Sequence, residues 1–288
     1  MRKILKKLTK YFPDELYLKM KYYKVFKKKL NLKNPQTFNE KLQWLKLHDR
    51  KDVYTTMVDK FEAKKYVANI IGEEYIIPTF GVYNTFDDID FNKLPNQFVM
   101  KCTHDSGGII IVKDKSKIDL KKAKSQMNEC LKRNFYYLSR EWPYKNVKPR
   151  IIIEKYMEEE GYIQLNDFKL MCFNGKVKYT FVCSERDNQK EGLAVTFFDN
   201  DWNKLPFERH YRSSKKKIEK PKNFGKMIEL AEKLAKNIPF LRVDFYEINN
   251  KIYFGELTFF PGGGFEEFTP EEWDYKLGEM IDLSKVKK

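Results

Sequence analysis

The segment 241–260 contains the residue types best suited to chemistry. Its apolar alternation predicts a β-hairpin, closed by a three-residue Asn-Asn-Lys loop in which asparagine tolerates left-handed backbone. In that register Asp244 lies opposite Glu256, and Arg242 lies opposite Thr258. All four side chains then share one face of the hairpin, because side chains alternate along a strand. A two-residue turn would instead put Asp244 and Glu256 on opposite faces.

Two carboxylates placed directly opposite each other repel unless a cation lies between them. Mg²⁺ suits such a pair, since it accepts one or two carboxylates together with phosphate oxygens and water. The alternative is that Arg242 neutralises Asp244 and Glu256 as an ion network on the surface. The pattern therefore predicts either a magnesium site or an ion network on this face.

A second candidate site lies in a turn rich in glycine. An apolar strand, 98–102, contains Lys101, and a second strand, 109–112, follows the turn Ser106-Gly107-Gly108. Backbone N–H groups in such a turn can hold a phosphate, to which the lysine adds a positive charge. The same pattern is typical of ordinary hairpin turns, and the sequence contains neither a Walker A loop nor a GxGxxG motif after a strand. His104 is a candidate general base, although a histidine in such a loop also serves structural or phosphate-binding roles.

The charge of the chain is concentrated at its N-terminus. The net charge is +15, and residues 1–33 hold twelve basic and two acidic side chains. Ile4, Leu8, Tyr11 and Phe12 recur within this segment near helical spacing. A basic amphipathic helix can lie on an anionic membrane surface, and it can equally pack its apolar stripe on the protein body. Nucleic acid is not an expected partner, because no helix-turn-helix, zinc finger or RNP-like segment accompanies the charge.

Composition excludes several other classes of protein. At 42% hydrophobic and 34% charged residues the chain has enough apolar material for a core, and no run of 18 apolar residues predicts a membrane span. The N-terminus has no continuous apolar stretch typical of a secretory signal. The four cysteines lack the spacing of a zinc site, so we expect a cytoplasmic protein with reduced thiols.

The remaining pattern predicts a mixed α and β protein with much antiparallel sheet. Thr37 and Glu40 form a capping box, and Asp59 with Glu62 repeats that signature. Asn174-Gly175 is a strong hairpin signal. The expected helices are 38–47, 59–71, 120–134, 223–237 and 273–281. The expected strands are 75–77, 98–102, 109–112, 150–156, 168–173, 176–183, 194–198, 202–205, 241–248 and 252–260.

Taken in order, these segments resemble the ATP-grasp superfamily, and more closely its TupA-like branch, which is associated with bacterial surface polysaccharide biosynthesis. The resemblance covers about residues 34–270. It rests on the following segments: 34–41 (Asn-Pro-Gln-Thr-Phe-Asn-Glu-Lys), Asp59-Lys60, 98–107, 149–156 (Pro-Arg-Ile-Ile-Ile-Glu-Lys-Tyr), Asp167-Phe168-Lys169, 199–202, Arg242-x-Asp244, Glu256-x-Thr258 and 261–264 (Pro-Gly-Gly-Gly).

The resemblance implies an α+β fold in which two subdomains enclose ATP. The expected division is a helical, basic N-terminal region at 1–58, a first ATP-grasp subdomain with a phosphate loop at 59–153, and a second subdomain with the metal site at 154–288. The ATP phosphates would contact seven basic or small residues: Lys60, Lys101, His104, Ser106, Gly107, Gly108 and Lys169. Adenine and ribose would lie against a hinge composed of Glu154, Lys155, Tyr156, Met157 and Glu160.

The resemblance also implies roles for the hairpin and the glycines after it. Asp244 and Glu256 would hold Mg²⁺, and Arg242 would stabilise an acyl phosphate. The backbone N–H groups of Gly262, Gly263 and Gly264 would bind the acceptor carboxylate. Two positions depart from the family pattern: Thr258 stands where many members have asparagine, and Asp105 stands where a glycine would suit a phosphate loop better.

These roles imply a carboxylate–amine ligase that uses Mg-ATP and forms an acyl phosphate. The expected partners are an acidic glycan or lipid-linked glycan precursor and an amine donor, and residues 1–33 would hold the protein at the inner membrane face. One alternative is a glycosyltransferase that uses a sugar nucleotide, for which Asp199-Asn-Asp201 has a suitable spacing. Another is a non-catalytic module that binds ATP or glycan.

Overall fold

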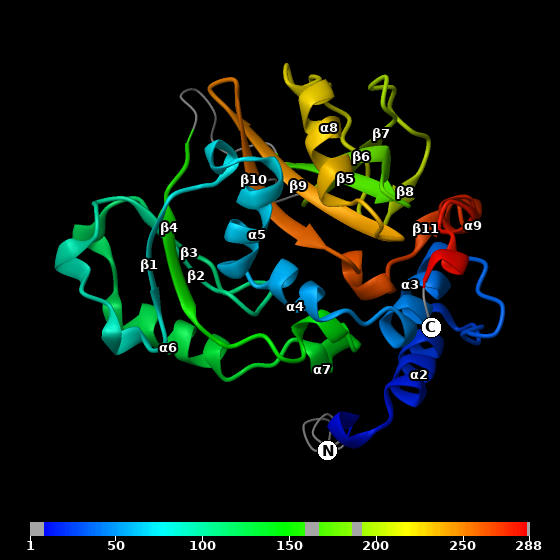
Figure 1. The fold of residues 1–288 in the computed structure, drawn as a ribbon, viewed down its shortest axis with the longest axis horizontal. Coiled ribbons are helices and arrows are strands. Elements are labelled where there is room, and N and C mark those ends of the chain that lie inside the picture. The colour runs from blue at the N-terminus through cyan, green and yellow to red at the C-terminus, as the bar shows by residue number, and fades with distance from the viewer. Residues whose placement is uncertain (1–8, 159–166, 186–191, 287–288) are drawn as a thin grey trace.

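The computed structural model describes residues 9–158, 167–185 and 192–286, and two antiparallel sheets organise them (Figure 1). The smaller sheet has the strand order β1-β4-β2-β3. Its strands are β1 (Thr79–Tyr83), β2 (Phe98–Cys102), β3 (Ile110–Val112) and β4 (Ile151–Lys155). Helix α6 (Leu120–Leu131) shares one apolar core with this sheet, in which Met127 packs with Met100 and Ile153. The strands expected at 98–102, 109–112 and 150–156 are confirmed.

The larger sheet has the strand order β10-β9-β5-β6-β7. Its strands are β5 (Asp167–Phe173), β6 (Lys176–Ser184), β7 (Ala194–Phe198), β9 (Phe240–Ile248) and β10 (Lys251–Thr258). Helix α8 (Phe224–Leu234) buries Met227, Leu230 and Leu234 in the core of this sheet. Helices α4 (Asp52–Val58) and α5 (Glu62–Ile71) lie between the two sheets in Figure 1, and their apolar faces join the larger core.

The N-terminal helices pack beside the C-terminal end of the chain. They are α2 (Asp14–Phe26) and α3 (Phe38–His48), and near them lie α7 (Tyr136–Ser139), α9 (Glu272–Glu279) and the short pair β8 (Glu208–Arg209) and β11 (Phe268–Thr269). The predicted capping box is confirmed: the Thr37 hydroxyl accepts from the Glu40 amide at 3.1 Å, and the Glu40 carboxylate accepts from the Thr37 amide at 3.2 Å. Among the described residues no helix is long and apolar enough to cross a membrane.

The hairpin between β5 and β6 is confirmed in its turn residues. Asn174 (φ 50°) and Gly175 (φ 83°) connect the paired residues Phe173 and Lys176. Two positive φ values in a two-residue loop match the type I′ turn, which suits the twist of adjoining strands. The Asn-Gly dipeptide therefore sets the register of two central strands.

The hairpin between β9 and β10 differs from the expected turn but reaches the expected pairing. Its turn has two residues, Asn249 (φ 51°) and Asn250 (φ 61°), so the prediction of a three-residue loop is wrong. A β-bulge at Gly255 then shifts the register by one residue. As a result Asp244 still pairs with Glu256, on the same face, because a bulge inserts one extra residue into one strand.

Two further expectations need correction. Residues 73–75 form a 3-10 turn after Gly72, and the strand begins at Thr79 beyond Pro78, so the strand predicted at 75–77 is wrong. Residues 202–205 form no full strand beside β7 but only a bridge from Phe198 to Lys204. The Asp199 side chain accepts from the turn amides of Asp201 and Asn203, which is typical of a turn-forming aspartate.

The type I′ turn gives a testable prediction on stability. Gly175→Ala should lower the free energy of unfolding by about 1 kcal/mol, because alanine resists the positive φ that the turn requires. Gly225→Ala is the matched control: Gly225 lies in α8, an added Cβ meets nothing within 4 Å, and alanine should stabilise the helix slightly. Urea unfolding of both variants measures these changes, and equal shifts of the midpoint in one direction would contradict this account of the turn.

Candidate functional site

A pocket of about 230 Å³ lies between the two sheets. Apolar side chains form most of its wall: Met57, Val58, Ala63, Ile76, Ile77, Val99, Ile109, Ile111, Met157, Tyr246, Phe254 and Leu257. Charged side chains gather there too: Lys60, Lys64, Lys101, Glu154, Lys155 and Glu256. An apolar slot with a few convergent charged groups is the usual form of a site for a small ligand.

A buried glutamate forms ion pairs with two of the lysines that line the pocket. Glu154 on β4 forms ion pairs with Lys64 of α5 and, at 2.5 Å, with Lys101 of β2. Burial opposes ionisation, but the charges of Lys101 and Lys64 are stronger and lower the pKa of Glu154 below its usual value. Helix α5 is thereby joined to the smaller sheet across the pocket. Sequence analysis missed Lys64, although it lies four residues after Lys60, a helical spacing that was a usable signal.

Lys60 connects the pocket to the predicted phosphate loop. Its ammonium group donates to the carbonyl oxygen of Asp105 at 2.7 Å, and burial lowers its pKa below the usual range. The Asp105 carboxylate lies on the other side, 3.3 Å from the Cys130 thiol and 3.5 Å from the Arg133 guanidinium. Because Arg133 partly neutralises this buried carboxylate, the departure at Asp105 does not leave an uncompensated negative charge in the loop.

The phosphate loop itself is shaped by its glycines. Gly107 (φ 124°) and Gly108 (φ 62°) adopt backbone that other residues resist, and a Cβ on Gly108 would lie 2.1 Å from the Cys130 sulfur. Phosphate binding by Ser106, Gly107 and Gly108 stays a prediction, since these residues adjoin the pocket through Lys60 but do not line it.

Phosphate binding by His104 stays a prediction. Its ring is buried, with Nε2 at 3.2 Å from the Cys130 carbonyl oxygen of α6, and it does not line the pocket. Burial lowers the pKa of His104. The contact at Nε2 fastens the loop to α6, and Nδ1 has no hydrogen-bond partner among the described residues. The four cysteines are all buried and free.

A row of charges crosses three strands of the larger sheet beside the pocket. The register pairs Lys169 of β5 with Asp244 of β9, and Asp244 with Glu256 of β10. The Lys169 ammonium forms ion pairs with Asp244 and, at 2.7 Å, with Asp167. Asp167, to which sequence analysis gave no role, therefore holds Lys169 from its own strand.

Arg242 lies between the two carboxylates, as the ion-network alternative predicted, but Arg242 and Asp244 are buried and not on the surface. Its Nε and a terminal nitrogen each lie 2.7 Å from an oxygen of Asp244, and that nitrogen lies 2.6 Å from Glu256. Burial works against ionisation of Glu256, but the charges of Arg242, Lys60 and Lys169 lower its pKa to about 2. A planar guanidinium suits this arrangement because it can donate to two carboxylates at once.

The two carboxylates also fit a magnesium ion. The Asp244 side chain is 1% exposed, whereas that of Glu256 is 40% exposed and lines the pocket. No group of three or more His, Cys, Asp or Glu side chains gathers among the described residues. A pair of carboxylates is the donor set expected when phosphate oxygens and water complete the ligands of Mg²⁺. The Thr258 hydroxyl lies 3.4 Å from the Glu256 carboxylate, beside the same position.

The predicted hinge borders the apolar end of the pocket. Lys155, Tyr156 and Met157 all line it. The Lys155 amide donates to the Pro78 carbonyl oxygen at 2.9 Å, so Lys155 can offer a base its carbonyl oxygen but not its N–H. Glu160 lies outside the described residues.

The glycines after β10 are arranged differently from the expectation for Gly263. Its amide donates to the Phe260 carbonyl oxygen at 2.8 Å, so this N–H does not face an acceptor. Its own carbonyl oxygen accepts from the buried Lys46 ammonium at 2.6 Å. Lys46 was not predicted, because its position on α3 gave no sign of this contact with a distant segment. Roles for Gly262 and Gly264 stay predictions.

The depressed pKa of Glu256 predicts how stability depends on pH. A carboxyl whose pKa falls on folding stabilises the protein above its unfolded pKa, and this contribution is lost as pH falls through its folded value. Glu256→Gln should therefore lower the free energy of unfolding at pH 7, by about 1 kcal/mol after solvent screening of a partly exposed pair. The difference from wild type should shrink between about pH 5 and pH 2. Urea unfolding across this range tests it, and a difference that does not depend on pH would contradict the assigned pairing.

The sequence matches one family model over most of its length. A family model described as TupA-like ATPgrasp matches residues 40–282. No curated protein matches the sequence. Among solved structures, a D-alanine–D-alanine ligase from Bacillus anthracis is 19% identical with a TM-score of 0.40, covering 70% of this chain and 57% of that one.

Two further solved structures are similar to a comparable degree. The Bacillus anthracis ligase complexed with ATP is 18% identical with a TM-score of 0.43, covering 78% of this chain and 65% of that one. The corresponding ligase from Helicobacter pylori is 16% identical with a TM-score of 0.40, covering 86% of this chain and 70% of that one. The chain thus spans less than two thirds of the two Bacillus chains. Since the family model spans most of the sequence, the chain belongs to the TupA-like ATP-grasp family.

Proposed function

We propose that this chain is an ATP-dependent carboxylate–amine ligase that uses magnesium. One observation carries the proposal: lysines from α5 and the smaller sheet meet Glu256 of the larger sheet at one pocket, whose other walls are apolar, and Arg242 joins Glu256 to the buried Asp244. A nucleoside triphosphate has this same division, with a flat apolar base at one end and a chain of anionic oxygens at the other.

The base would lie at the apolar end of the pocket. Ile77 and Val99 lie on the side of the smaller sheet, and Tyr246 and Leu257 lie on that of the larger sheet. The backbone of Met157 supports specificity for a base, because it lies at the pocket edge directly after the strand β4. Packing of the base between these apolar side chains would supply affinity, and hydrogen bonds to backbone groups would orient the base.

The phosphates would lie among the lysines. Lys60 and Lys101 line the pocket beside Glu256, and Glu154 holds Lys101 and Lys64 in place. Lysine is well suited to this role, as a compact charge on a flexible stem. Phosphate oxygens would compete with Glu154 for these ammonium groups, so nucleotide binding would rearrange the Glu154 cluster.

Asp244 and Glu256 would hold the magnesium ion, with phosphate oxygens and water as its other ligands. When bound, the ion would neutralise charge on the transferred phosphoryl group. Burial raises the pKa of Asp244, and the charges of Arg242 and Lys169 beside that carboxylate oppose this rise and would favour its ionised form.

The chain's own residues can support the transfer without a side-chain nucleophile. The carboxylate of the acid substrate would attack the γ-phosphorus, forming a carboxyl–phosphate bond as the bond to ADP breaks. An amine would then attack the acyl carbon, giving an amide with release of phosphate and a proton. Arg242 would stabilise the negative charge that develops on the transferred group. Its position between Asp244 and Glu256 supports this role.

For the substrate we propose an acidic sugar, of the uronic-acid type, in a surface polysaccharide precursor. The proposal rests on the TupA-like family membership, together with the basic character of the chain, whose net charge is +15. A surplus of positive charge attracts anionic polymers. We propose in addition that an amine is the second substrate and that the protein acts in the cytoplasm.

Nucleotide binding gives the first test of this function. Mg-ATP should raise the thermal midpoint of the wild type, since a ligand at a hundredfold excess over its Kd adds about 2.7 kcal/mol. Lys101→Met should weaken ATP binding by about tenfold or more, because it removes a partly buried charge from the phosphate end. Lys93→Met, at an exposed lysine outside the pocket, is the matched control and should bind ATP like the wild type. A shift with UDP-glucose or UDP-glucuronate but none with Mg-ATP would favour a glycosyltransferase instead.

The chemical step gives a second test. With Mg-ATP and glucuronate or galacturonate, hydroxylamine should trap the acyl phosphate as a hydroxamate. Arg242→Lys should lower the rate of trapping by about a hundredfold while ATP affinity changes only a few-fold, because the planar, two-pronged donor is lost although its charge remains. Trapping by this variant at the wild-type rate would contradict the role of Arg242. ATP binding without trapping of any acid in a broad panel would favour a non-catalytic binding module.

A further inference from the structure

Helix α2 has two apolar faces, and only one of them is covered. Leu18 and Tyr22 are buried, and they form a small core with Leu30 and Phe265. On the opposite side Leu16, Met20 and Tyr23 have relative exposures of 47%, 50% and 58%. Their spacing of four and three residues places them in one stripe along the helix. A single helix therefore packs against the protein with one side and presents apolar surface with the other.

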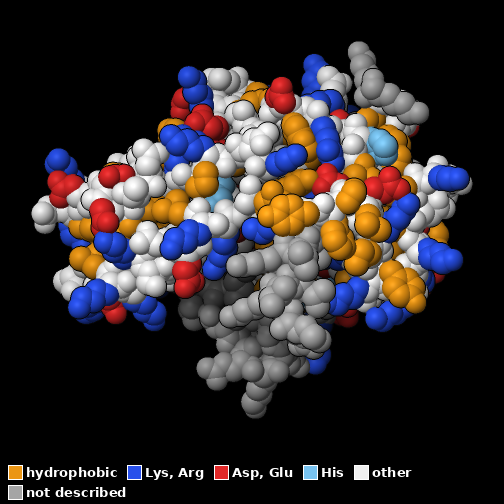
Figure 2. All heavy atoms as spheres, turned by 90° about the horizontal axis from the view of Figure 1, so that it is seen from below, with side chains coloured by type: hydrophobic (Ala, Val, Ile, Leu, Met, Phe, Trp, Pro, Cys, Tyr) orange, Lys and Arg blue, Asp and Glu red, His pale blue; other side chains and the backbone are white. Residues whose placement is uncertain are grey.

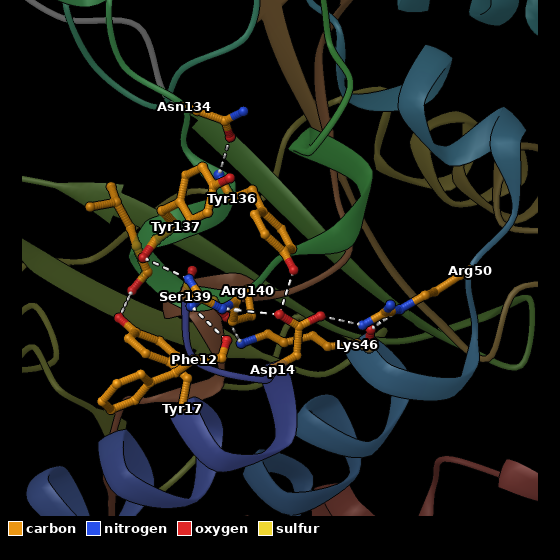
Figure 3. Close-up of polar contacts among 11 residues, drawn as sticks. Phe12, Asp14, Tyr17, Lys46, Arg50, Asn134, Tyr136, Tyr137, Ser139 and Arg140 are labelled. Carbon is orange, nitrogen blue, oxygen red and sulfur yellow. Dashed lines mark hydrogen bonds and ion pairs between the residues drawn. The ribbon is translucent and has the colours of Figure 1, made fainter. Parts of the chain in front are cut away.

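Polar contacts at the N-terminal half of α2 fix which side faces outward (Figure 3). Asp14 forms ion pairs with Arg140 at 3.0 Å and with Arg50 at 2.8 Å, and it accepts from the Tyr136 hydroxyl. The Arg140 guanidinium is buried, and it stacks 4.2 Å from the centre of the Tyr17 ring. Charged and aromatic contacts thus hold the N-terminal half of the helix against the protein.

Two further hydrogen bonds join α2 to α7. The Tyr17 hydroxyl and the Lys21 ammonium both donate to the Leu138 carbonyl oxygen at 2.8 Å. The Leu138 side chain is itself exposed, as is Tyr11 just before α2. Figure 2 shows this side of the molecule, where orange hydrophobic side chains lie among blue lysine and arginine side chains. These contacts fix the position of α2, so the stripe of Leu16, Met20 and Tyr23 is held facing outward.

The charges around the apolar stripe indicate which kind of surface binds it. Residues 10–33 contain eight lysines and two acidic residues. Both acidic residues are engaged: Asp14 with two arginines, and Glu15 with Lys19. Lys24 and Lys27 are exposed beside the stripe. A second copy of this chain would bring two strongly positive faces together, which electrostatic repulsion disfavours. A surface with an apolar interior and negatively charged groups outside it can bury the apolar residues and attract the lysines at the same time.

We propose that the outward face of α2 binds the surface of an anionic lipid bilayer, with Leu16, Met20 and Tyr23 inserted among the acyl chains and the lysines among the headgroups. The helix would lie in the plane of the interface. Insertion removes apolar area from water, and each lysine near the surface adds attraction that salt screens. The protein would thereby be held at a membrane through a face that does not include the pocket between the sheets.

Vesicle flotation of the full chain tests this proposal. Vesicles of phosphatidylcholine with about one third phosphatidylglycerol should retain the protein at low salt, and pure phosphatidylcholine vesicles should retain it far less. Met20→Ser with Tyr23→Ser should lower the partition coefficient by about tenfold or more. Lys24→Gln with Lys27→Gln should lower it by about tenfold.

A matched control variant distinguishes binding through α2 from nonspecific adsorption, and a measurement of unfolding excludes misfolding. Leu120→Ser with Lys121→Gln changes an exposed leucine and an exposed lysine on α6, and it should bind vesicles like the wild type. Thermal unfolding shows whether each variant is folded. Binding that persists in the Met20/Tyr23 variant would overturn the proposal in favour of a purely electrostatic contact. Absence of binding by the folded wild type would also overturn it, as would a dimer that the Met20/Tyr23 variant abolishes while no vesicles are bound.

Discussion

Asp244 and Glu256 lie side by side on neighbouring strands, and they can share that face only because cations lie between and beside them. Arg242 contacts both carboxylates, and Lys169 contacts Asp244 from the next strand. Opposed like charges in a sheet are destabilising unless they are compensated, so the four side chains constrain one another. The row ties β5, β9 and β10 together at the place where the larger sheet borders the pocket.

The smaller sheet offers a complementary cluster on the other side. Glu154 holds Lys64 and Lys101 from a helix and a strand, while Lys60 reaches the loop that carries Asp105. Lysines on the side of the smaller sheet therefore share a largely apolar pocket with Glu256 of the larger sheet, whose neighbour Asp244 is buried and does not line that pocket. Each cluster is satisfied internally in the absence of a ligand. A polyanion carrying a divalent cation could exchange partners with both, which is why the two halves together suit Mg-ATP better than either does alone.

The sequence predicted which residues of the larger sheet pair, but not the turn and the bulge that bring them together. Asp244 and Glu256 pair as expected, yet through a two-residue turn and a bulge at Gly255 that cancel in register. A bulge has no signal in alternation beyond a lone glycine, so it could not be placed. The Thr37 capping box and the Asn174-Gly175 turn depend on near neighbours and were predicted correctly. The reciprocal capping box expected at Asp59 and Glu62 does not form, because α5 begins at Glu62 and the Glu62 carboxylate pairs with Arg150. The burial of His104 and the contacts of Lys46 depend on distant segments, and no local pattern indicated them.

A crystal structure of the chain with magnesium and a non-hydrolysable ATP analogue tests the central claim most directly. The account predicts the base between Ile77 and Leu257, the phosphates within hydrogen-bond distance of Lys60 and Lys101, and a metal ion on Glu256 and Asp244. It also predicts that the Glu154 ion pairs seen here are rearranged. A nucleotide bound elsewhere, or one bound in the pocket while Arg242 remains the sole cation between the two carboxylates, would contradict it.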